Sequence, residues 1–326
     1  MRKIDALYVP LLAILIYLMY FAKFSSIFLP PIFLIAGCFV LIKGSDFFVE
    51  ASVAIAAKLG MSEHSVGITV VAFGTSLPEL AISAMASYKG YTDTAWGNVI
   101  GSNVTNILLV LGVAMFISAI KPSRFAFKDS VSMLLVSFIT LFLVLDDSLQ
   151  TFDGIILIAF YVFFLLTLRG RRAEEEMKVE LPSLFIILTF LAGLAGISVG
   201  AEAMVKGAVE MAHYLGVTEV AIAASIVALG TSLPELSTSV VAAVKKHHGI
   251  AVGNVIGSNI VNLSLVLGLA AVIRRINVAV SSPAILFFII ATIATPLMIR
   301  RKAMKKITGV ILLILYMLFI ISLYWL

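Results

Sequence analysis

Long apolar runs separated by short polar segments form the dominant pattern of this chain. Each run has about 17–25 residues, which is the length that an α-helix needs to cross a hydrocarbon core of about 30 Å. The pattern therefore predicts about eleven transmembrane helices. The predicted spans are 6–22, 30–50, 64–87, 96–119, 129–145, 154–168, 182–204, 219–243, 252–273, 281–299 and 307–325.

The composition supports a membrane protein. Of the 326 residues, 61% are hydrophobic and 13% are charged, and the mean hydropathy is +1.13. Soluble domains are about half apolar and about a quarter charged. The net charge of +5 lies in short loops, which indicates control of topology and not a nucleic-acid surface. The single cysteine, Cys38, excludes a disulfide framework, and no His/Cys cluster indicates a zinc or iron site.

The first apolar run has two interpretations. Basic residues at 1–3 precede apolar residues 6–21, as they would in a signal peptide. No A-x-A cleavage pattern follows, and Asp5 interrupts the start of the run. We therefore predict that residues 6–22 are retained as a transmembrane helix.

Basic loops predict the orientation of the chain in the membrane. If the helices alternate in direction, the four basic loops and the basic N-terminus all fall on one side, and an acidic loop at 146–153 falls on the other. The positive-inside rule then predicts a cytoplasmic N-terminus and an external C-terminus in the cell membrane. Arg274 and Arg275 lie on the other side and depart from the rule. The basic loops are 121–128, 169–178, 245–248 and 300–306.

An internal repeat organises the whole chain. VAFGTSLPEL at 71–80 returns as VALGTSLPEL at 227–236, so that Gly74 and Gly230 are 156 positions apart (230 − 74). The same offset relates Gly97 to Gly253. Five predicted helices separate the two copies, and this odd number makes the second copy enter the membrane from the opposite face. Inverted repeats are typical of secondary transporters, whose sites lie near the midplane between the repeats.

The first repeated motif, Gly-Thr-Ser-Leu-Pro-Glu, places a helix breaker beside a carboxylate. Pro78 removes one backbone N–H and disturbs the carbonyl of Gly74. Thr75 and Ser76 are four and three residues before Glu79, which brings their side chains to one face of a turn. The motif thus gathers carboxylate, hydroxyl and carbonyl oxygens, the ligands that calcium prefers and that also suit sodium.

The second repeated motif, Gly-Asn-Val-Ile-Gly-Ser-Asn-x-x-Asn, forms a polar stripe on a helix. Asn98, Ser102 and Asn106 recur at four-residue steps, and Asn254, Ser258 and Asn262 repeat them. Its glycines allow neighbouring helices to approach closely, and they are more often packing residues than ligands.

Structural explanations fit some of these residues. A membrane proline is often only a kink, and Ser102 or Ser258 alone could bond to its own helix. Glu79 and Glu235 differ, because an ionisable group deep in a membrane is rare and indicates function. A further acidic pair at the same offset, Asp46 and Glu202, fits either an ion pathway or interfacial charges.

At these motifs the sequence resembles the sodium/calcium exchanger family, and specifically its short prokaryotic members. The resemblance covers nearly the whole chain after about residue 30. It implies an all-α integral membrane fold with ten core helices in two inverted repeats of five, plus an extra N-terminal helix. The implied organisation is 1–29 for the extra helix, 30–168 for the first repeat, 169–181 for a short cytoplasmic linker and 182–326 for the second repeat.

The resemblance also implies an ion site and its ligands. Calcium would be held by the carboxylates of Glu79 and Glu235, with the carbonyls of Thr75 and Thr231. The remaining implied site residues are Ser76, Ser232, Ser102 and Ser258 and the carbonyls of Ala72 and Ala228 for sodium, with Asn106 and Asn262 completing the central cluster. Some relatives have Asp in place of Asn262, and potassium-dependent relatives rely on acidity there, so this departure argues against potassium transport.

The expected function is therefore electrogenic exchange of three Na⁺ for one Ca²⁺ by alternating access, in a monomer within the lipid bilayer and without a cofactor. The main alternative is a Ca²⁺/H⁺ antiporter that uses the same glutamates as proton carriers. A cation channel is a second alternative, because carboxylates could line a pore, but nothing in an inverted repeat calls for a channel. An intramembrane hydrolase would need two carboxylates in dissimilar surroundings, whereas the motifs are duplicated, so we expect no enzymatic activity.

Overall fold

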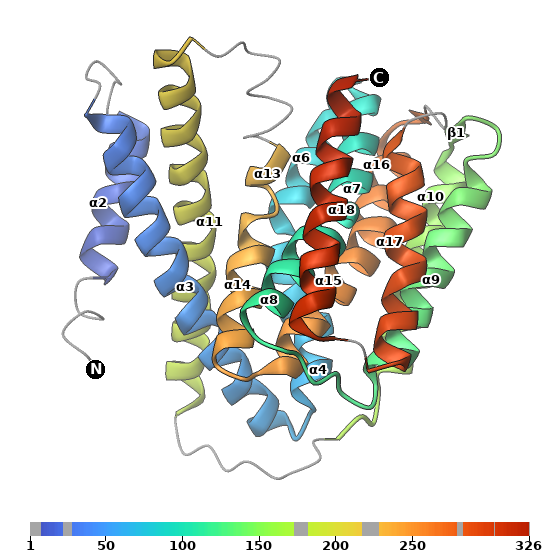
Figure 1. The fold of residues 1–326 in the computed structure, drawn as a ribbon, viewed down its shortest axis with the longest axis horizontal. Helices are drawn as coiled ribbons and strands as arrows, with labels where there is room; N and C mark the ends of the chain where they lie inside the picture. The colour runs from blue at the N-terminus through green and yellow to red at the C-terminus, as the bar shows by residue number, and fades with distance from the viewer. Residues whose placement is uncertain are drawn as a thin grey trace.

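A computed structural model of the 326-residue chain describes residues 8–21, 28–172, 182–216, 228–278, 283–302 and 304–325. The described part is almost entirely helical (Figure 1). Seven of its helices are long and apolar enough to cross a membrane, or eight if a bent pair of helices is one span. This confirms the predicted all-α membrane fold.

The predicted spans correspond to helices or chains of short helices. The labels η1, η2 and η4 denote π-helical segments. The first half contains α2 (Tyr8–Phe21), α3 (Leu29–Leu59), α4 (Glu63–Val66), η1 (Gly67–Val71), α5 (Ala72–Thr75), α6 (Leu77–Lys89), α7 (Thr92–Thr105), η2 (Asn106–Leu111), α8 (Gly112–Ile117), α9 (Ala126–Leu143), β1 (Ser148–Leu149) and α10 (Thr151–Thr167). The second half contains α11 (Ser183–Tyr214), α13 (Ala228–Gly230), α14 (Leu233–Val244), α15 (His248–Val261), η4 (Asn262–Val266), α16 (Leu267–Ile273), β2 (Ile276–Asn277), α17 (Pro283–Arg300) and α18 (Lys306–Trp325).

Two helices are longer than predicted. α3 ends at Leu59 and α11 at Tyr214, well past the predicted ends at 50 and 204. Charged residues near those predicted ends interrupt the apolar pattern, but a helix can continue through them. α3 stops at Gly60, which adopts a left-handed conformation with φ +61° and returns its N–H to the last turn. Part of the predicted span 219–243, up to residue 227, lies outside the described residues.

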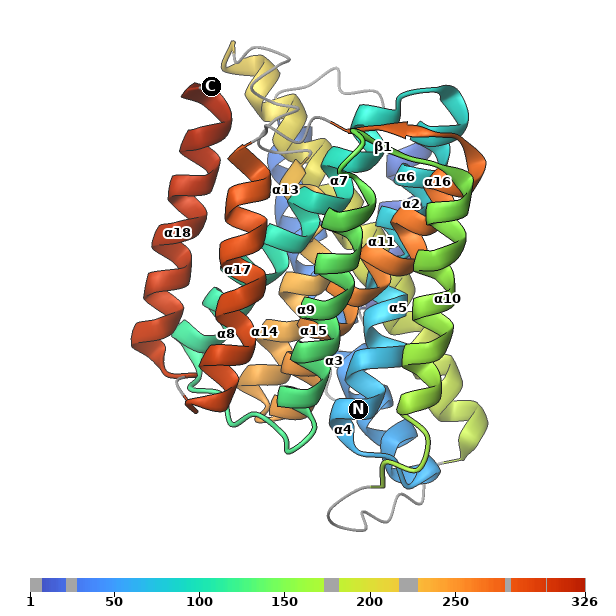
Figure 2. The same ribbon diagram turned by 90° about the vertical axis from the view of Figure 1, so that its right-hand side faces the viewer.

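The two repeats run through the molecule in opposite directions. In Figures 1 and 2 the chain rises from α4 through α5 to α6, whereas it descends from α13 to α14. Helices α3 and α11 show the same relation at close range. Their backbones cross so closely that only glycine fits. If Gly44 carried a Cβ atom, that atom would lie 2.8 Å from the backbone nitrogen of Ile197, and a Cβ on Gly200 would lie 2.5 Å from the backbone nitrogen of Leu41. Each member of this contact is the 156-residue counterpart of the other, so the pair lies on a pseudo-twofold axis.

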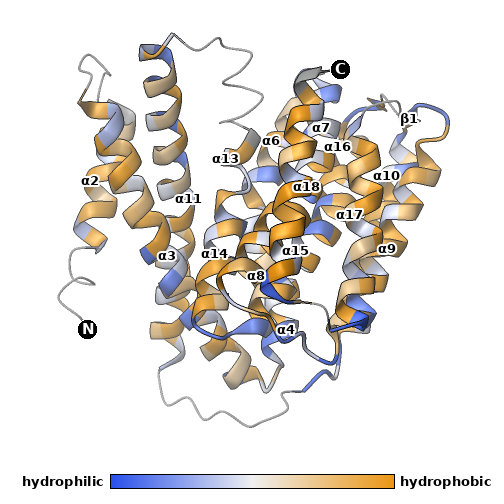
Figure 3. Cartoon of the chain, viewed as in Figure 1, coloured by the Kyte–Doolittle hydropathy of each residue, from blue (hydrophilic) through white to orange (hydrophobic). Residues whose placement is uncertain are grey.

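The described loops lie at two ends of the molecule (Figures 1 and 2), and the end with the loops at 121–125 and 245–247 is called the basic end. At the basic end, Ile120 N bonds Met304 O at 3.0 Å, and Met61 forms a bridge with Arg172. At the other end, strand β1 pairs antiparallel with β2. Figure 3 shows hydrophobic residues over the helices and hydrophilic residues concentrated toward these ends. The ends thus bracket an apolar zone that suits a bilayer.

Candidate ion-binding site

Each repeated Gly-Thr-Ser-Leu-Pro-Glu motif forms a break between two helices. α5 ends at Thr75 and α6 begins at Leu77, and the two halves of this span meet at 46°. Pro78 therefore occupies the first turn of α6, where its missing N–H costs no helical hydrogen bond. Glu79 lies in the same turn, so the partial positive charge of the helix N-terminus is next to its carboxylate. Glu235 holds the corresponding place in α14.

The two glutamates lie in the interior of the protein. Both side chains are 0% exposed, and each lies in the first turn after the helix break of its own repeat. Ser76 crosses from one repeat to the other, because its hydroxyl donates to Glu235 Oε1 at 3.2 Å. The structure thus joins the two breaks in one buried site, although they are far apart in sequence.

Identical side-chain bonds brace the two glutamate turns. Asn98 Nδ2 donates to Ser83 Oγ at 2.8 Å and lies 3.4 Å from the backbone oxygen of Glu79. In the other repeat, Asn254 Nδ2 donates to Ser239 Oγ at 3.0 Å and lies 3.4 Å from the backbone oxygen of Glu235. The asparagines of the polar stripe therefore act on the broken helices. The two serines were missed from the sequence, although they share the repeat offset of 156 and could have been found by it.

Thr75 connects the first break to α15. Its hydroxyl donates to Asn254 Oδ1 at 3.1 Å and lies 3.5 Å from Ser258 Oγ. The carbonyl of Ala72 accepts the N–H of Ser76 at 3.0 Å. Residues of both motifs and both repeats are therefore in contact at this point.

The other candidate residues take various positions. Ser102, Ser232, Ser258, Asn106 and Asn262 are buried, Thr231 is half-buried, and Ala228 begins α13. Asn106 and Asn262 are each the first residue of a π-helical segment, η2 and η4. Such segments are rare and often occur at functional sites. The sequence pattern did not predict them.

Several buried polar atoms of the site lack hydrogen-bond partners within the described part of the chain. They are Glu79 Oε1 and Oε2, Glu235 Oε2, Ser232 Oγ, and both side-chain polar atoms of Asn106 and Asn262. A buried oxygen without a partner is costly, and a bound cation would satisfy it. The donor set is carboxylate, amide and hydroxyl oxygen, which suits hard cations such as Ca²⁺.

The second acidic pair at the repeat offset, Asp46 and Glu202, lies outside the site and forms ion pairs with lysines. Asp46 forms an ion pair with Lys245, and Glu202 pairs with Lys206 on its own helix at 3.1 Å. The Glu202 side chain is 54% exposed. Of the two interpretations of this pair, interfacial charge thus gains support, although the contacts do not test ion passage.

The fold and site define a class: a helical membrane protein with two inverted repeats and a buried oxygen-rich site between them. A family model described as "Sodium/calcium exchanger protein" matches residues 29–169 and 185–325. The chain belongs to the sodium/calcium exchanger family, which consists of transporters.

Individual relatives agree with this assignment. Sodium/calcium exchanger MaX1 of Methanosarcina acetivorans is 32% identical, over 90% of this chain and 97% of its own. The putative antiporter CaxA of Alkalimonas amylolytica is 34% identical, over 86% and 94%. A solved structure of the sodium-calcium exchanger NCX_Mj superposes with a TM-score of 0.83 at 33% identity, covering 91% of this chain and 100% of that one.

Proposed function

We propose that this protein exchanges Na⁺ for Ca²⁺ across the cell membrane by alternating access. The observation that carries the proposal is the pair of fully buried glutamates, Glu79 and Glu235. They lie at two helix breaks that the Ser76–Glu235 hydrogen bond joins, and they retain three carboxylate oxygens without partners among the described residues. In a membrane interior such oxygens require a cation. The similarity to MaX1 and NCX_Mj, both named as sodium/calcium exchangers, supports the same pair of ions.

The proposed ligands divide between the two ions. Glu79 and Glu235 with the carbonyls of Thr75 and Thr231 bind Ca²⁺. The hydroxyls of Ser76, Ser232, Ser102 and Ser258 and the carbonyls of Ala72 and Ala228 bind Na⁺, with Asn106 and Asn262 at the centre. An asparagine at position 262 adds no charge, which argues against potassium transport.

Charge gives a reason for obligatory exchange. With both glutamates ionised the site carries −2, which one Ca²⁺ neutralises and three Na⁺ exceed by one. Uncompensated buried carboxylates cost several kcal/mol each, so the empty site resists the conformational change and an occupied site permits it. We propose a stoichiometry of three Na⁺ to one Ca²⁺, in a monomer whose basic end is cytoplasmic.

The test is calcium uptake into proteoliposomes with one gradient imposed at a time. We expect uptake of radioactive calcium when a Na⁺ gradient is imposed, and none with K⁺ or H⁺ gradients alone. Uptake that follows the pH gradient without sodium would instead establish a Ca²⁺/H⁺ antiporter, and flux without any counter-ion would establish a channel. A reversal potential that fits two Na⁺ per Ca²⁺ would contradict the stoichiometry.

A further inference from the structure

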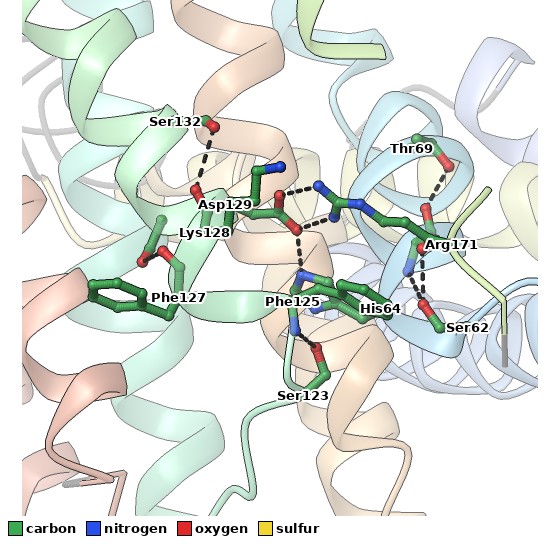
Figure 4. Close-up of polar contacts among 12 residues, drawn as sticks. Ser62, His64, Thr69, Ser123, Phe125, Phe127, Lys128, Asp129, Ser132 and Arg171 are labelled. Atoms are coloured by element: carbon green, nitrogen blue, oxygen red, sulfur yellow. Dashed lines mark hydrogen bonds and ion pairs between the residues drawn. The ribbon is translucent and has the colours of Figure 1, made fainter. Parts of the chain in front are cut away.

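A second buried polar cluster lies at the basic end of the molecule, separate from the ion site. Arg171 donates from Nη1 to Asp129 Oδ2 at 2.6 Å and from Nη2 to Oδ1 at 2.8 Å. His64 Nε2 donates to the same Oδ2 at 2.9 Å. Figure 4 shows the arginine and the histidine converging on the carboxylate. Asp129 and His64 are at most 1% exposed, and Arg171 is 9% exposed.

The cluster connects two parts of the first repeat with the segment that follows it. His64 belongs to α4, Asp129 to the first turn of α9, and Arg171 to the segment that follows α10 and leads toward the second repeat. The bidentate arginine–carboxylate pair fixes orientation as well as distance. Arg171 also lies 5.1 Å from the ring centroid of Phe125, which precedes α9. The start of the broken span is thus attached to two other elements inside the protein.

The span that begins at His64 lies directly on α15. Glycines on α15 allow this close approach: a Cβ added to Gly253 would lie 2.7 Å from His64 O, and one added to Gly257 would lie 2.5 Å from Ile68 O and 2.6 Å from Ala72 Cβ. The backbone of α15 therefore packs closely against α4, η1 and α5. This contact ends at Thr75, which bonds Asn254 on α15. A shift of α4 along α15 would consequently move Thr75 relative to Asn254.

In the sequence, neither His64 nor Asp129 recurs at the repeat offset of 156. The 156-residue counterpart of Asp129 is Ile285, and the counterpart of His64 is Val220. The ion-site motifs are duplicated, so a residue needed by the motif alone would be duplicated too. The cluster is therefore a property of the first broken span.

We propose that His64, held by Asp129 and Arg171, is a positioning residue that fixes the register of α4–η1–α5 on α15 and so places Thr75 in the ion site. His64 is not one of the proposed ion ligands. It acts on Thr75 along 11 residues of the chain (75 − 64), which is about 16 Å of helix. The effect on ion binding rests on the proposed ion site, and the role in transport rests in addition on the proposed exchange. Ser76 and Glu79 follow the same segment, so the register also sets the approach of Glu79 to the second repeat.

The test changes His64 and leaves the Asp129–Arg171 pair intact, because removing Asp129 would leave a buried arginine unpaired. The variants are His64→Leu, His64→Gln, whose amide can still donate to Asp129, and the control Glu50→Gln. Glu50 lies on α3 and pairs with Lys245 at the same end at 2.7 Å, but its side chain is 57% exposed. Two readouts are measured: the calcium concentration for half-maximal thermal stabilisation in detergent, and that for half-maximal sodium-driven uptake.

We expect His64→Leu to raise both half-saturating calcium concentrations about tenfold, with maximal uptake per folded protein within about twofold of the unmodified chain. His64→Gln should restore most of the affinity, and Glu50→Gln should change it little. Reduced maximal uptake at unchanged affinity would show a scaffold role and overturn the inference, as would equal defects in His64→Leu and His64→Gln. Absence of sodium-driven uptake in the unmodified protein would contradict the proposed function, while calcium stabilisation would still test this positioning role.

Discussion

The two copies of the internal repeat are alike at the ion site and differ at the basic end of the molecule. At the site the two halves agree in detail, because Asn98 and Asn254 brace Glu79 and Glu235 through the same bonds. At the basic end the first half has a buried ion cluster around Asp129, whereas the second half has Ile285 at the equivalent position. Ion binding thus requires the same residues in both copies, whereas contacts with the rest of the fold require different residues in each copy.

The largest effect should come from neutralising either site glutamate. Glu79→Gln and Glu235→Gln each remove one of two buried charges that compensate the ion, at about 3 kcal/mol or more, which is on the order of a 100-fold loss of calcium affinity. We expect sodium-driven calcium uptake to be abolished in both variants. The matched control is Glu50→Gln, because that side chain is 57% exposed and pairs with Lys245. Near-normal uptake in either site variant would show that the two halves are not equivalent.

A smaller loss of uptake should follow when a methyl group is added at the symmetric contact between α3 and α11. Gly44→Ala and Gly200→Ala each place a methyl group less than 3 Å from backbone of the other helix. The helices must separate, which costs about 1–3 kcal/mol, and both variants should lose thermal stability and uptake to similar extents. Ile42→Ala is the control, because Ile42 is 51% exposed on the same helix. Stability equal to that of the control would contradict the close crossing.

Next in size are the serines that receive the asparagine bonds. Ser83→Ala and Ser239→Ala each remove the acceptor of one amide N–H, that of the half-buried Asn98 and that of the buried Asn254, at a cost of about 1–3 kcal/mol. Because the bonds are equivalent, the two variants should weaken calcium binding equally, by about tenfold. Calcium titration monitored by thermal stability measures both. A large effect of only one serine would show that the bracing is functional in one repeat alone.

The smallest effect is expected for the acidic pair on α3 and α11. The ion pairs of Asp46 and Glu202 are partly exposed, and such pairs contribute about 0–1 kcal/mol. Asp46→Asn and Glu202→Gln should therefore retain most uptake at saturating calcium. Loss of uptake in both variants at unchanged protein stability would support the alternative, that these residues line an ion pathway.

Much of the fold could be predicted from the sequence, because a bilayer requires long apolar helices and a duplicated chain shows its symmetry in the spacing of residues. The exceptions have physical reasons. The ends of α3 and α11 were placed too early, since charges such as Asp46 and Glu202 interrupt the apolar pattern without interrupting the helix. The π-helical segments beginning at Asn106 and Asn262 leave no mark in the periodicity of so apolar a stretch.

For this protein the sequence by itself determined the membrane class, the inverted repeat and the pair of glutamates, because helix breakers and carboxylates in apolar spans are costly and conspicuous. Only the tertiary structure decided which groups meet. It brought Ser76 to Glu235 and Thr75 to Asn254 across the repeats, and it buried Asp129 between His64 and Arg171. These contacts join residues that are far apart along the chain, so they depend on how the helices pack, which no local pattern records.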